Sequence, residues 1–303
     1  MHDIIVIGAG PAGLTAALYA LRANKSVLVL EKSSFGGQMT FSPKIENYPG
    51  FAAVSGNELA DKLVEQVLAQ GADVELEEVE AIEASGKIKR VITDSGEHEC
   101  RSIIVATGAK HRLLGVPGED KFIGDGISFC AVCDGAFYTG KRVAVIGGGN
   151  SALQEAALLS EQCESVTMIQ NLDYMTGEKR LVEALESKPN VSFILGTVVK
   201  EFIGDDELSG VITERVSDKT TQTLSFDGVF VAIGLAPENG IIEKWTRLDH
   251  GYIVSDERCL TDTEGVFTAG DCRTKSVRQI TTATADGATA ALAACAYIDS
   301  AEQ

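Results

Sequence analysis

Residues 4–31 read IIVIGAGPAGLTAALYALRANKSVLVLE, and this stretch decides the fold of the first part of the chain. The apolar run 4–7 predicts a short strand that is buried on both faces, as in a parallel sheet. Residues 14–22 have the pattern of a helix, and the apolar run 27–30 predicts the next strand. The order strand, glycine-rich turn, helix, strand predicts a βαβ unit and an α/β fold.

The turn itself, Gly8-x-Gly10-x-x-Gly13, has the glycine spacing of a dinucleotide site. Gly8 permits the tight turn, Gly10 lets the backbone approach a pyrophosphate, and Gly13 allows the helix to pack closely on the strand. Glu31 lies about 20 residues further on, where a carboxylate accepts hydrogen bonds from a ribose. Because that carboxylate repels a 2′-phosphate, the site favours FAD or NAD over NADP. The alternative is a βαβ unit that binds nothing.

A second unit of the same kind occurs later in the chain. It consists of a strand at 142–146, the turn Gly147-x-Gly149-x-x-Ala152, a helix at 150–160 and a strand at 165–169. Two such units predict an internal duplication, and therefore two dinucleotide-binding, Rossmann-like domains. Pro117-Gly118 interrupts the pattern between them, so a domain boundary is expected near residues 112–118.

Hydrophobic patterning predicts several further elements. They are helices at 57–71 and 283–297 and strands at 73–79, 89–93, 102–106, 229–233 and 266–269.

The motif Cys130-Ala131-Val132-Cys133-Asp134 lies just before the second unit. Two cysteines at this spacing can carry two electrons as a dithiol/disulfide couple. A zinc site would need two more ligands, but the four histidines are isolated and there is no second Cys-x-x-Cys, so no metal is expected. The single cysteines are expected to be buried small hydrophobic residues; they are Cys100, Cys163, Cys259, Cys272 and Cys295.

The formal net charge of −18 argues against nucleic acid and against an anionic membrane surface as partners. No apolar run reaches membrane-spanning length, and the N-terminus shows no secretory signal. We therefore expect a cytoplasmic protein.

These motifs together resemble the low-molecular-weight thioredoxin reductases over essentially the whole chain. The resemblance rests on the two glycine turns, on the cysteine motif with its aspartate, and on Gly36-Gly37-Gln38, Glu46-Asn47-Tyr48-Pro49-Gly50, Ala106-Thr107-Gly108, Gly270-Asp271 and Arg278-Gln279. It implies an FAD-binding domain made of residues 1–112 and 243–303. An NAD(P)-binding-like domain, 113–242, would be inserted and would carry the cysteines. It also implies a homodimer in which the second domain rotates relative to the first.

The resemblance also implies roles for individual residues. The ADP half of FAD would contact Gly8, Gly10, Gly13 and Glu31. Gly37 and Gln38 would lie along the cofactor, with Thr107 and Gly108 beside it, and Asp271 would bond the ribityl or pyrophosphate part. Asn47 would approach the isoalloxazine, and the residues near the flavin ring would be Arg278, Gln279 and Ile280.

At the cysteines, the resemblance makes Cys133 the sulfur next to the flavin and Cys130 the other redox sulfur. Which thiol attacks the protein substrate is left open by the sequence. Asp134 would be the acid/base residue that protonates a departing thiolate. Its alternative role is to cap the helix that follows the cysteine turn.

The chain departs from this family after its second glycine turn. There the family has His-Arg-Arg, with another arginine soon after, and these arginines bind the 2′-phosphate of NADPH. Residues 169–177 of this chain read IQNLDYMTG and contain no arginine. One interpretation is an NADH site in which Asn171 or Asp173 contacts the ribose. The other is a vestigial nucleotide site, as in the ferredoxin-dependent flavin thioredoxin reductases, which the chain resembles in this respect.

We favour reduced ferredoxin as the electron donor. Ferredoxins are acidic and would be repelled by this acidic chain, unless a basic patch such as 87–90 offsets the repulsion. The leading hypothesis is a flavoenzyme that reduces the disulfide of thioredoxin or of a thioredoxin-like protein through Cys130 and Cys133. The alternatives are an NADH- or NADPH-dependent thioredoxin reductase, a reductase for another small redox protein, and a flavin-binding redox sensor without turnover.

Overall fold

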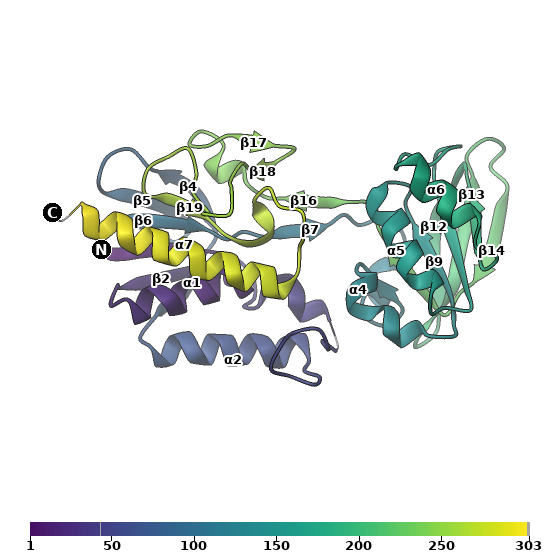
Figure 1. Cartoon of the computed structure of the whole chain (residues 1–303), viewed down its shortest axis with the longest axis horizontal. Coiled ribbons are helices and arrows are strands. Elements are labelled where there is room, and N and C mark those ends of the chain that lie inside the picture. The colour runs from purple at the N-terminus through teal and green to yellow at the C-terminus, as the bar shows by residue number, and fades with distance from the viewer. Residues whose placement is uncertain (43, 302–303) are drawn as a thin grey trace. The chain divides into compact units, whose positions relative to one another are not determined.

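A computed structural model describes residues 1–42 and 44–301 (Figure 1). It divides into two compact units. The first comprises Met1–Lys110 and the chain from Ala236 onward, and the second comprises His111–Leu235. The second unit is thus an insertion in the first. The second unit contains a parallel sheet and the first a mostly parallel one, both flanked by helices, which confirms the predicted α/β class with two Rossmann-like domains.

The second junction lies before Ala236, whereas the sequence placed it after residue 242. Side chains of the intervening segment belong to the first unit. Asn239 donates to the backbone oxygens of Gly251 and Cys272, both at 2.8 Å. Ile242 is fully buried in the core of that unit. The chain crosses between the units in β7 (Ala109–His111) and β16 (Leu235–Pro237), which pair with each other.

The large sheet of the first unit has the order β3-β2-β1-β6-β5-β4, and β19 also pairs with β6. Its strands are β1 (His2–Ile7), β2 (Val27–Glu31), β3 (Asp73–Leu76), β4 (Val79–Glu83), β5 (Lys89–Thr93), β6 (Glu97–Val105) and β19 (Val266–Thr268). β1 runs parallel to β2 and β6, while β4 and β5 form an antiparallel hairpin beside β6. The predicted strand 73–79 ends at Leu76, and the separate strand β4 was not predicted.

β1 is buried on both faces. Ile4 and Val6 belong to the core that includes residues of α1 (Pro11–Arg22) and α7 (Ile280–Ser300), and Ile5 and Ile7 belong to the core on the opposite face. This is why the sequence 4–7 is uniformly apolar. The other helical segments of the unit are α2 (Gly56–Ala69), η1 (Gly37–Phe41), η3 (Gly240–Ile242) and η4 (Gly270–Cys272), and β17 (Leu248–Asp249) pairs with β18 (Tyr252–Ile253).

The second unit has a parallel sheet of order β11-β10-β9-β15-β8. Its strands are β8 (Ile127–Ser128), β9 (Arg142–Ile146), β10 (Ser165–Ile169), β11 (Val191–Ile194) and β15 (Gly228–Val231), and its helical segments are α3 (Glu119–Phe122), α4 (Ala131–Asp134), η2 (Gly135–Tyr138), α5 (Asn150–Ser160) and α6 (Lys179–Glu186). The predicted strand–turn–helix–strand unit corresponds to β9, α5 and β10.

An antiparallel sheet that was not predicted from the sequence completes this unit. It consists of β12 (Thr197–Gly204), β13 (Leu208–Arg215) and β14 (Thr221–Ser225). Phe202 and Val211 from this sheet pack in the same core as Val229 and Val231 of the parallel sheet.

Among the helices of the described residues, none is both long enough and apolar enough to cross a membrane.

Helices α1 and α7 pack backbone against backbone (Figure 1). A Cβ atom on Gly287 of α7 would lie 2.2 Å from the carbonyl oxygen of Ala12 in α1. The approach of the two helices therefore depends on the missing side chain at Gly287.

We expect Gly287→Ala to lower the free energy of unfolding. The forced separation of α1 and α7 costs about 1–3 kcal/mol, which exceeds the roughly 1 kcal/mol gained in helix propensity. Denaturant unfolding measures the difference. Gly240→Ala is the matched control, because a Cβ there would meet no atom within 4 Å. Equal stability of the two variants would contradict the packing argument.

Candidate functional site

The first glycine turn joins β1 to α1 by close backbone contacts. Gly8 has φ +106°, and a Cβ there would lie 2.4 Å from the carbonyl oxygen of Ala106. A Cβ on Gly13 would lie 1.8 Å from the carbonyl oxygen of Gly8. Both positions therefore require glycine, one for conformation and space and the other for space alone.

At the N-terminus of α1 a second glycine loop approaches the first. Gly10 is the N-cap residue, Pro11 follows as the first helical residue, and no side chain caps the helix. A Cβ on Gly10 would have only one neighbour within 4 Å, the Cα of Gly37 at 3.9 Å. The first-turn amides and the positive end of the helix dipole are thus left for an anion. Gln38 is exposed next to Gly37.

Glu31 lies at the end of β2, beside this turn. Its Oε2 accepts a hydrogen bond from the backbone N–H of Ala9 at 2.9 Å, and its Oε1 accepts from the N–H of Ser33 at 3.1 Å. These two bonds fix the carboxylate in place. The Ser33 hydroxyl also donates to Oε1, at 3.3 Å, so Oε2 is the oxygen that keeps a lone pair for a ribose hydroxyl.

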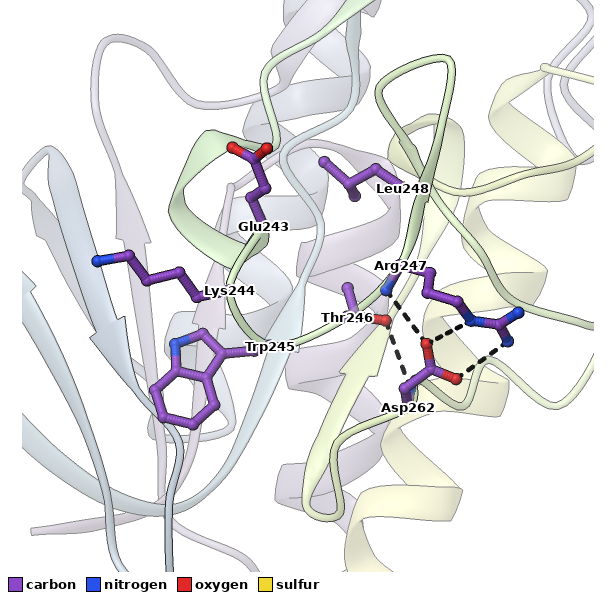
Figure 2. A pocket seen from close by; sticks show the side chains of 7 residues that line it. All are labelled: Glu243, Lys244, Trp245, Thr246, Arg247, Leu248 and Asp262. Atoms are coloured by element: carbon purple, nitrogen blue, oxygen red, sulfur yellow. Dashed lines mark hydrogen bonds and ion pairs between the residues drawn. The ribbon is translucent and has the colours of Figure 1, made fainter.

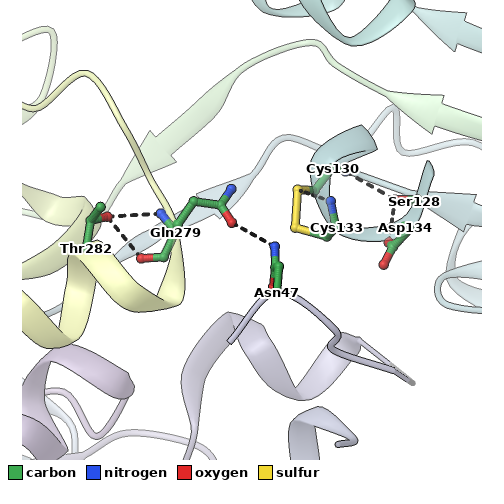
Figure 3. Close-up of a disulfide and its surroundings, with 7 residues drawn as sticks. All are labelled: Asn47, Ser128, Cys130, Cys133, Asp134, Gln279 and Thr282. Atoms are coloured by element: carbon green, nitrogen blue, oxygen red, sulfur yellow. Dashed lines mark hydrogen bonds between the residues drawn. A yellow bond between two sulfur atoms is a disulfide. The ribbon is translucent and has the colours of Figure 1, made fainter. Parts of the chain in front are cut away.

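Two other predicted residues contact each other within the first unit. The side-chain amide of Asn47 donates to Oε1 of Gln279 at 3.2 Å (Figure 3). Gln279 is the N-cap of α7 and forms a capping box with Thr282, and Ile280 is the first residue of that helix. The Asn47 loop is therefore held against the start of α7.

Thr107 and Gly108 follow β6. The Thr107 hydroxyl donates to Oδ1 of Asn239 at 2.8 Å, and Gly108 has φ +69° with open space where a Cβ would be. Asn239 was not predicted from sequence. Its contacts are to residues far away in the chain, and no local motif marks it.

Asp271 has a buried oxygen, Oδ1, without a hydrogen-bond partner. Burial raises the pKa of its carboxyl, although Lys275 and Arg278 oppose this effect. The guanidinium of Arg278 donates to the backbone oxygens of Asp271, Arg273 and Lys275 at 3.2–3.4 Å. Arg278 thus holds the loop that carries Asp271, and a contact with the flavin ring stays a prediction.

Asp286 anchors the same loop and was also not predicted. It lies inside α7, where its carboxylate accepts from the guanidinium of Arg273 at 2.8 and 2.9 Å and from Lys275 Nζ at 2.8 Å. Its Oδ2 also accepts the backbone N–H of Gly270 at 3.0 Å. All three ionic side chains are more than nine-tenths buried, so each charge needs its partners. The only sequence signal for Asp286 was the presence of an acidic residue among the alanines of α7.

These features fit an FAD molecule. The open glycine approach and the α1 N-terminus suit a pyrophosphate, and Glu31 suits a ribose. The orphaned oxygen of Asp271 suits a hydroxyl donor such as those of the ribityl chain, because a buried acceptor without a donor is costly.

The second unit carries the cysteine motif. Cys130 and Cys133 form a disulfide, with a Cα–Cα distance of 5.3 Å (Figure 3). Both cysteines lie at α4, where Cys130 is the N-cap residue and its Sγ accepts the backbone N–H of Cys133 at 3.2 Å. The helical turn thus places the two sulfurs on the same side.

Asp134 follows directly and is joined to the disulfide by Ser128. The Ser128 hydroxyl donates to Oδ2 of Asp134 at 2.6 Å and accepts the backbone N–H of Cys130 at 3.1 Å (Figure 3). Burial raises the pKa of Asp134, and the Ser128 hydrogen bond partly opposes the rise. Asp134 is the N-cap residue of η2, as the alternative role predicts, but its side chain makes no capping hydrogen bond there. Ser128 itself was missed, because it lies outside the cysteine motif.

All five single cysteines are buried and free, as predicted. Burial raises the pKa of Cys100 and of Cys259 to about 12, so neither is a thiolate at neutral pH.

The second glycine turn differs from the first around Gly148, but Gly149, the counterpart of Gly10, is equally open: a Cβ there would meet only Thr176 Oγ1, at 3.8 Å. Gly148 accepts hydrogen bonds on its carbonyl oxygen from the N–H groups of Thr176 and Gly177, at 2.8 and 2.9 Å. A Cβ on Gly148 would lie 2.3 Å from Nε2 of Gln170, which is buried. The segment after β10 therefore folds back onto the turn.

Acidic residues, not basic ones, lie along this folded segment. Asn150 accepts the backbone N–H of Glu178 at 2.6 Å, which fixes the end of the segment. The first cations beyond it are already paired: Arg180 with Glu178 and Lys179 with Glu183.

The segment 87–90, considered as a basic patch, is not one. Lys89 is buried, with Nζ donating to the backbone oxygens of Ala84 and Gly86. Arg90 is paired with both Glu83 and Glu97.

A surface pocket of about 510 Å³ in the first unit is separate from these residues (Figure 2). Residues 243–248 and Asp262 line it, and none of the predicted site residues does. Figure 2 shows Arg247 in a bidentate ion pair with Asp262, at 2.9 and 3.2 Å. The pocket thus offers no link to the predicted chemistry.

Comparison with known proteins agrees with this geometry. Residues 2–287 match the pyridine nucleotide-disulphide oxidoreductase family. The chain is 42% identical to a thioredoxin reductase of Treponema pallidum, covering 98% of this chain and 97% of the relative. It is 41% identical to a "34.2 kDa protein in rubredoxin operon" of Clostridium pasteurianum, covering 98% and 97%.

Among solved structures, a thioredoxin reductase from Streptococcus pyogenes superposes with a TM-score of 0.95 at 41% identity, covering 99% of each chain. The matches extend over both units and include the cysteine-bearing insertion. The chain therefore belongs to the low-molecular-weight thioredoxin reductases, a family of FAD-dependent disulfide oxidoreductases.

Proposed function

We propose that this thioredoxin reductase receives its electrons from reduced ferredoxin, and passes them through Cys130 and Cys133 to thioredoxin or a thioredoxin-like protein. The observation that carries the disulfide chemistry is the Cys130–Cys133 bond with Asp134 and Ser128 beside it. When bound, FAD supplies the two-electron reducing equivalent.

Each residue of the cysteine motif then has a separate role in the reaction. Two electrons break the S–S bond and, with one proton, give a thiol and a thiolate. One thiolate attacks the disulfide of the protein substrate to form a mixed disulfide, and the second cysteine releases the reduced substrate. Asp134 supplies the proton for a departing thiolate, which its raised pKa favours. The placement of Cys133 next to the flavin stays a prediction.

The choice of donor is supported by the segment that follows β10. A 2′-phosphate needs multivalent cationic donors, and Gln170, Asn171 and Leu172 offer none. The N–H groups of Thr176 and Gly177 are already used by Gly148, and the first cations that follow in the sequence are paired with glutamates. Phosphate binding to these two N–H groups would therefore have to displace their bonds to Gly148.

An NADH-dependent reductase is the alternative. Against it, β10 ends at Ile169 and is followed by Gln170, whose side chain is buried and whose Oε1 accepts the N–H of Asn171. No acid stands at the strand end, where Glu31 stands in the first unit. The name of the clostridial relative, which refers to a rubredoxin operon, also favours a small electron-carrier protein as the donor. A homodimer stays part of this proposal.

Replacing either redox cysteine should abolish thioredoxin reduction and leave flavin binding intact. In Cys130→Ser and Cys133→Ser the dithiol cannot form, whereas the first unit is unchanged. The measurement is insulin reduction coupled through thioredoxin, together with the flavin absorbance per protein. Cys163→Ala, at a buried free cysteine, is the control and should retain activity. Activity in both serine variants would exclude the relay.

Reduced ferredoxin should bleach the flavin, and NADPH and NADH should not. The readout is anaerobic flavin absorbance, with reoxidation by added thioredoxin disulfide. The double variant Asn171→Arg, Leu172→Arg restores two cations of the family pattern. It should raise the NADPH-driven rate about tenfold or more, since each charged hydrogen bond contributes about 1.5–3 kcal/mol. The ferredoxin-driven rate should not change. Rapid bleaching of the unaltered protein by either nucleotide would refute the donor assignment.

Asp271→Ala should weaken FAD binding, because it removes the buried acceptor Oδ1. We expect the dissociation constant to rise about tenfold, the effect of one hydrogen bond to a charged group. Titration of the apoprotein with FAD, followed by flavin fluorescence, measures it. Asp256→Ala is the control, since that exposed carboxylate is paired with Arg258. Unchanged affinity in Asp271→Ala would remove Asp271 from the flavin site.

A further inference from the structure

Glu155 is a partly buried acid that the mechanism above does not use. It lies on α5, one turn before Leu159 and next to Ala156, both fully buried. Its Oε2 is inaccessible to solvent and has no hydrogen-bond partner. A carboxylate in such a place loses its hydration without compensation, so the neutral acid is favoured.

Helix α4, which carries the redox cysteines, packs directly on α5. Ala131 shares a hydrophobic core with Leu153, Ala156 and Leu159. A Cβ on Gly135 would lie 3.3 Å from Cδ2 of Leu159. Asp134 is therefore held against the same helix as Glu155.

Asp134 and Glu155 each have one buried carboxyl oxygen without a hydrogen-bond partner. Oδ1 of Asp134 is also buried without a partner, although its Oδ2 is bonded to Ser128. Burial, and secondarily the charge of Asp134, raises the pKa of Glu155 to about 8. Burial also raises the pKa of Asp134, against the Ser128 bond. With a pKa of about 8, the Glu155 carboxyl is protonated at neutral pH.

Other charged groups around α5 are engaged elsewhere. β10 carries no charged residue, and Arg142 of β9 is paired with Asp227. Tyr138 of η2 also lies near Asp134, and its pKa is raised to about 12 by burial and by the charges of Asp134, Asp125 and Glu207. Lys141 Nζ lies 5.4 Å from the Tyr138 ring, and Cys163, whose pKa is raised by burial, shares the core of Ala156 and Leu159. Helix α6 also packs on α5, and its charged residues are Lys179, Arg180, Glu183 and Glu186. Lys179 is paired with Glu183, and Arg180 is paired with Glu178. Asp134 is the electrostatic neighbour that acts on Glu155.

We propose that Glu155 is a positioning residue that stores the proton which Asp134 delivers when the Cys130–Cys133 disulfide is reduced. This inference rests on the dithiol relay of the proposed function. Two electrons break the S–S bond and leave two negative charges on sulfur. Asp134 delivers one proton to a thiolate, and the proton comes to Asp134 from Glu155. The products are one thiol, one thiolate and a doubly ionised carboxyl pair, which solvent reprotonates.

The physical advantage of the store is charge balance. Without Glu155, the proton would have to come from water to a buried carboxylate at the moment when negative charge appears on sulfur. A neutral acid already in the pocket supplies it without bringing in a hydrated ion.

The test uses dithiothreitol as reductant, so that it requires neither ferredoxin nor thioredoxin. Its two thiols become a cyclic disulfide as Cys130–Cys133 becomes a dithiol, which thiol labelling follows in time. The ratio of the wild-type rate to the Glu155→Gln rate cancels the ionisation of dithiothreitol. We expect a ratio of about ten at neutral pH. It should fall to one as the pH rises through about 8, where Glu155 loses its proton.

Glu161→Gln is the matched control. Glu161 is an exposed carboxylate at the C-terminus of the same helix and is paired with Lys188. Its ratio should be one at every pH. Two results for Glu155→Gln overturn the proposal: a rate ratio of one at every pH, or a ratio that differs from one by the same factor at every pH. A residue with a structural role alone would not make the rate ratio change with pH.

If Glu155→Gln does not fold, two other measurements decide. Glu155→Asp keeps the acid and should retain a pH-dependent rate. In the wild-type protein, infrared spectroscopy should show a protonated carboxyl band that titrates near pH 8, and its absence at neutral pH overturns the proposal. Failure of the donor or substrate assignment would leave the dithiothreitol result unchanged, so the two failures are distinguishable.

Discussion

Close backbone approach is the constraint on which the flavin-binding unit depends. The carbonyl oxygen of Gly8 lies where a side chain on Gly13 would begin, and the carbonyl of Ala12 lies where one on Gly287 would begin. These contacts place the N-terminus of α1 at the end of β1 and pack α7 along it. The same approach leaves the first amides of α1 facing open space beside Gly37, which is what a pyrophosphate needs.

The two glycine turns show that the glycine motif alone does not specify which ligand a site binds. Both join a buried strand to a helix, and both begin with a glycine at positive φ, Gly8 and Gly147. At the first turn the neighbours are a fixed carboxylate and a second glycine. At the second, the side chain of Gln170 and the backbone of Thr176 lie beside Gly148, while Gly149, the counterpart of Gly10, is as open as Gly10. The turn geometry serves the fold in both units, and the surrounding residues determine the ligand.

Buried carboxyls without full hydrogen bonding mark the predicted chemistry in each unit. Asp271 has one orphaned oxygen in the first unit, and Asp134 and Glu155 each have one in the second. Asp286 shows the contrast, since two buried cations and a backbone N–H satisfy it and its pKa is lowered despite burial. A satisfied buried charge fixes a loop, whereas an orphaned one awaits a ligand or holds a proton.

The sequence by itself determined the features that depend on local spacing. These include β1, α1 and β2 with their turn, the repeat at β9, and the cysteine pair, because each is specified by residues a few positions apart. It did not show β4, the sheet of β12–β14 or the earlier second junction. It also did not show the contacts of Asn239, Ser128, Asp286 and Glu155. These depend on residues remote in the chain, and burial and hydrogen-bond partners exist only once the sheets and helices have packed.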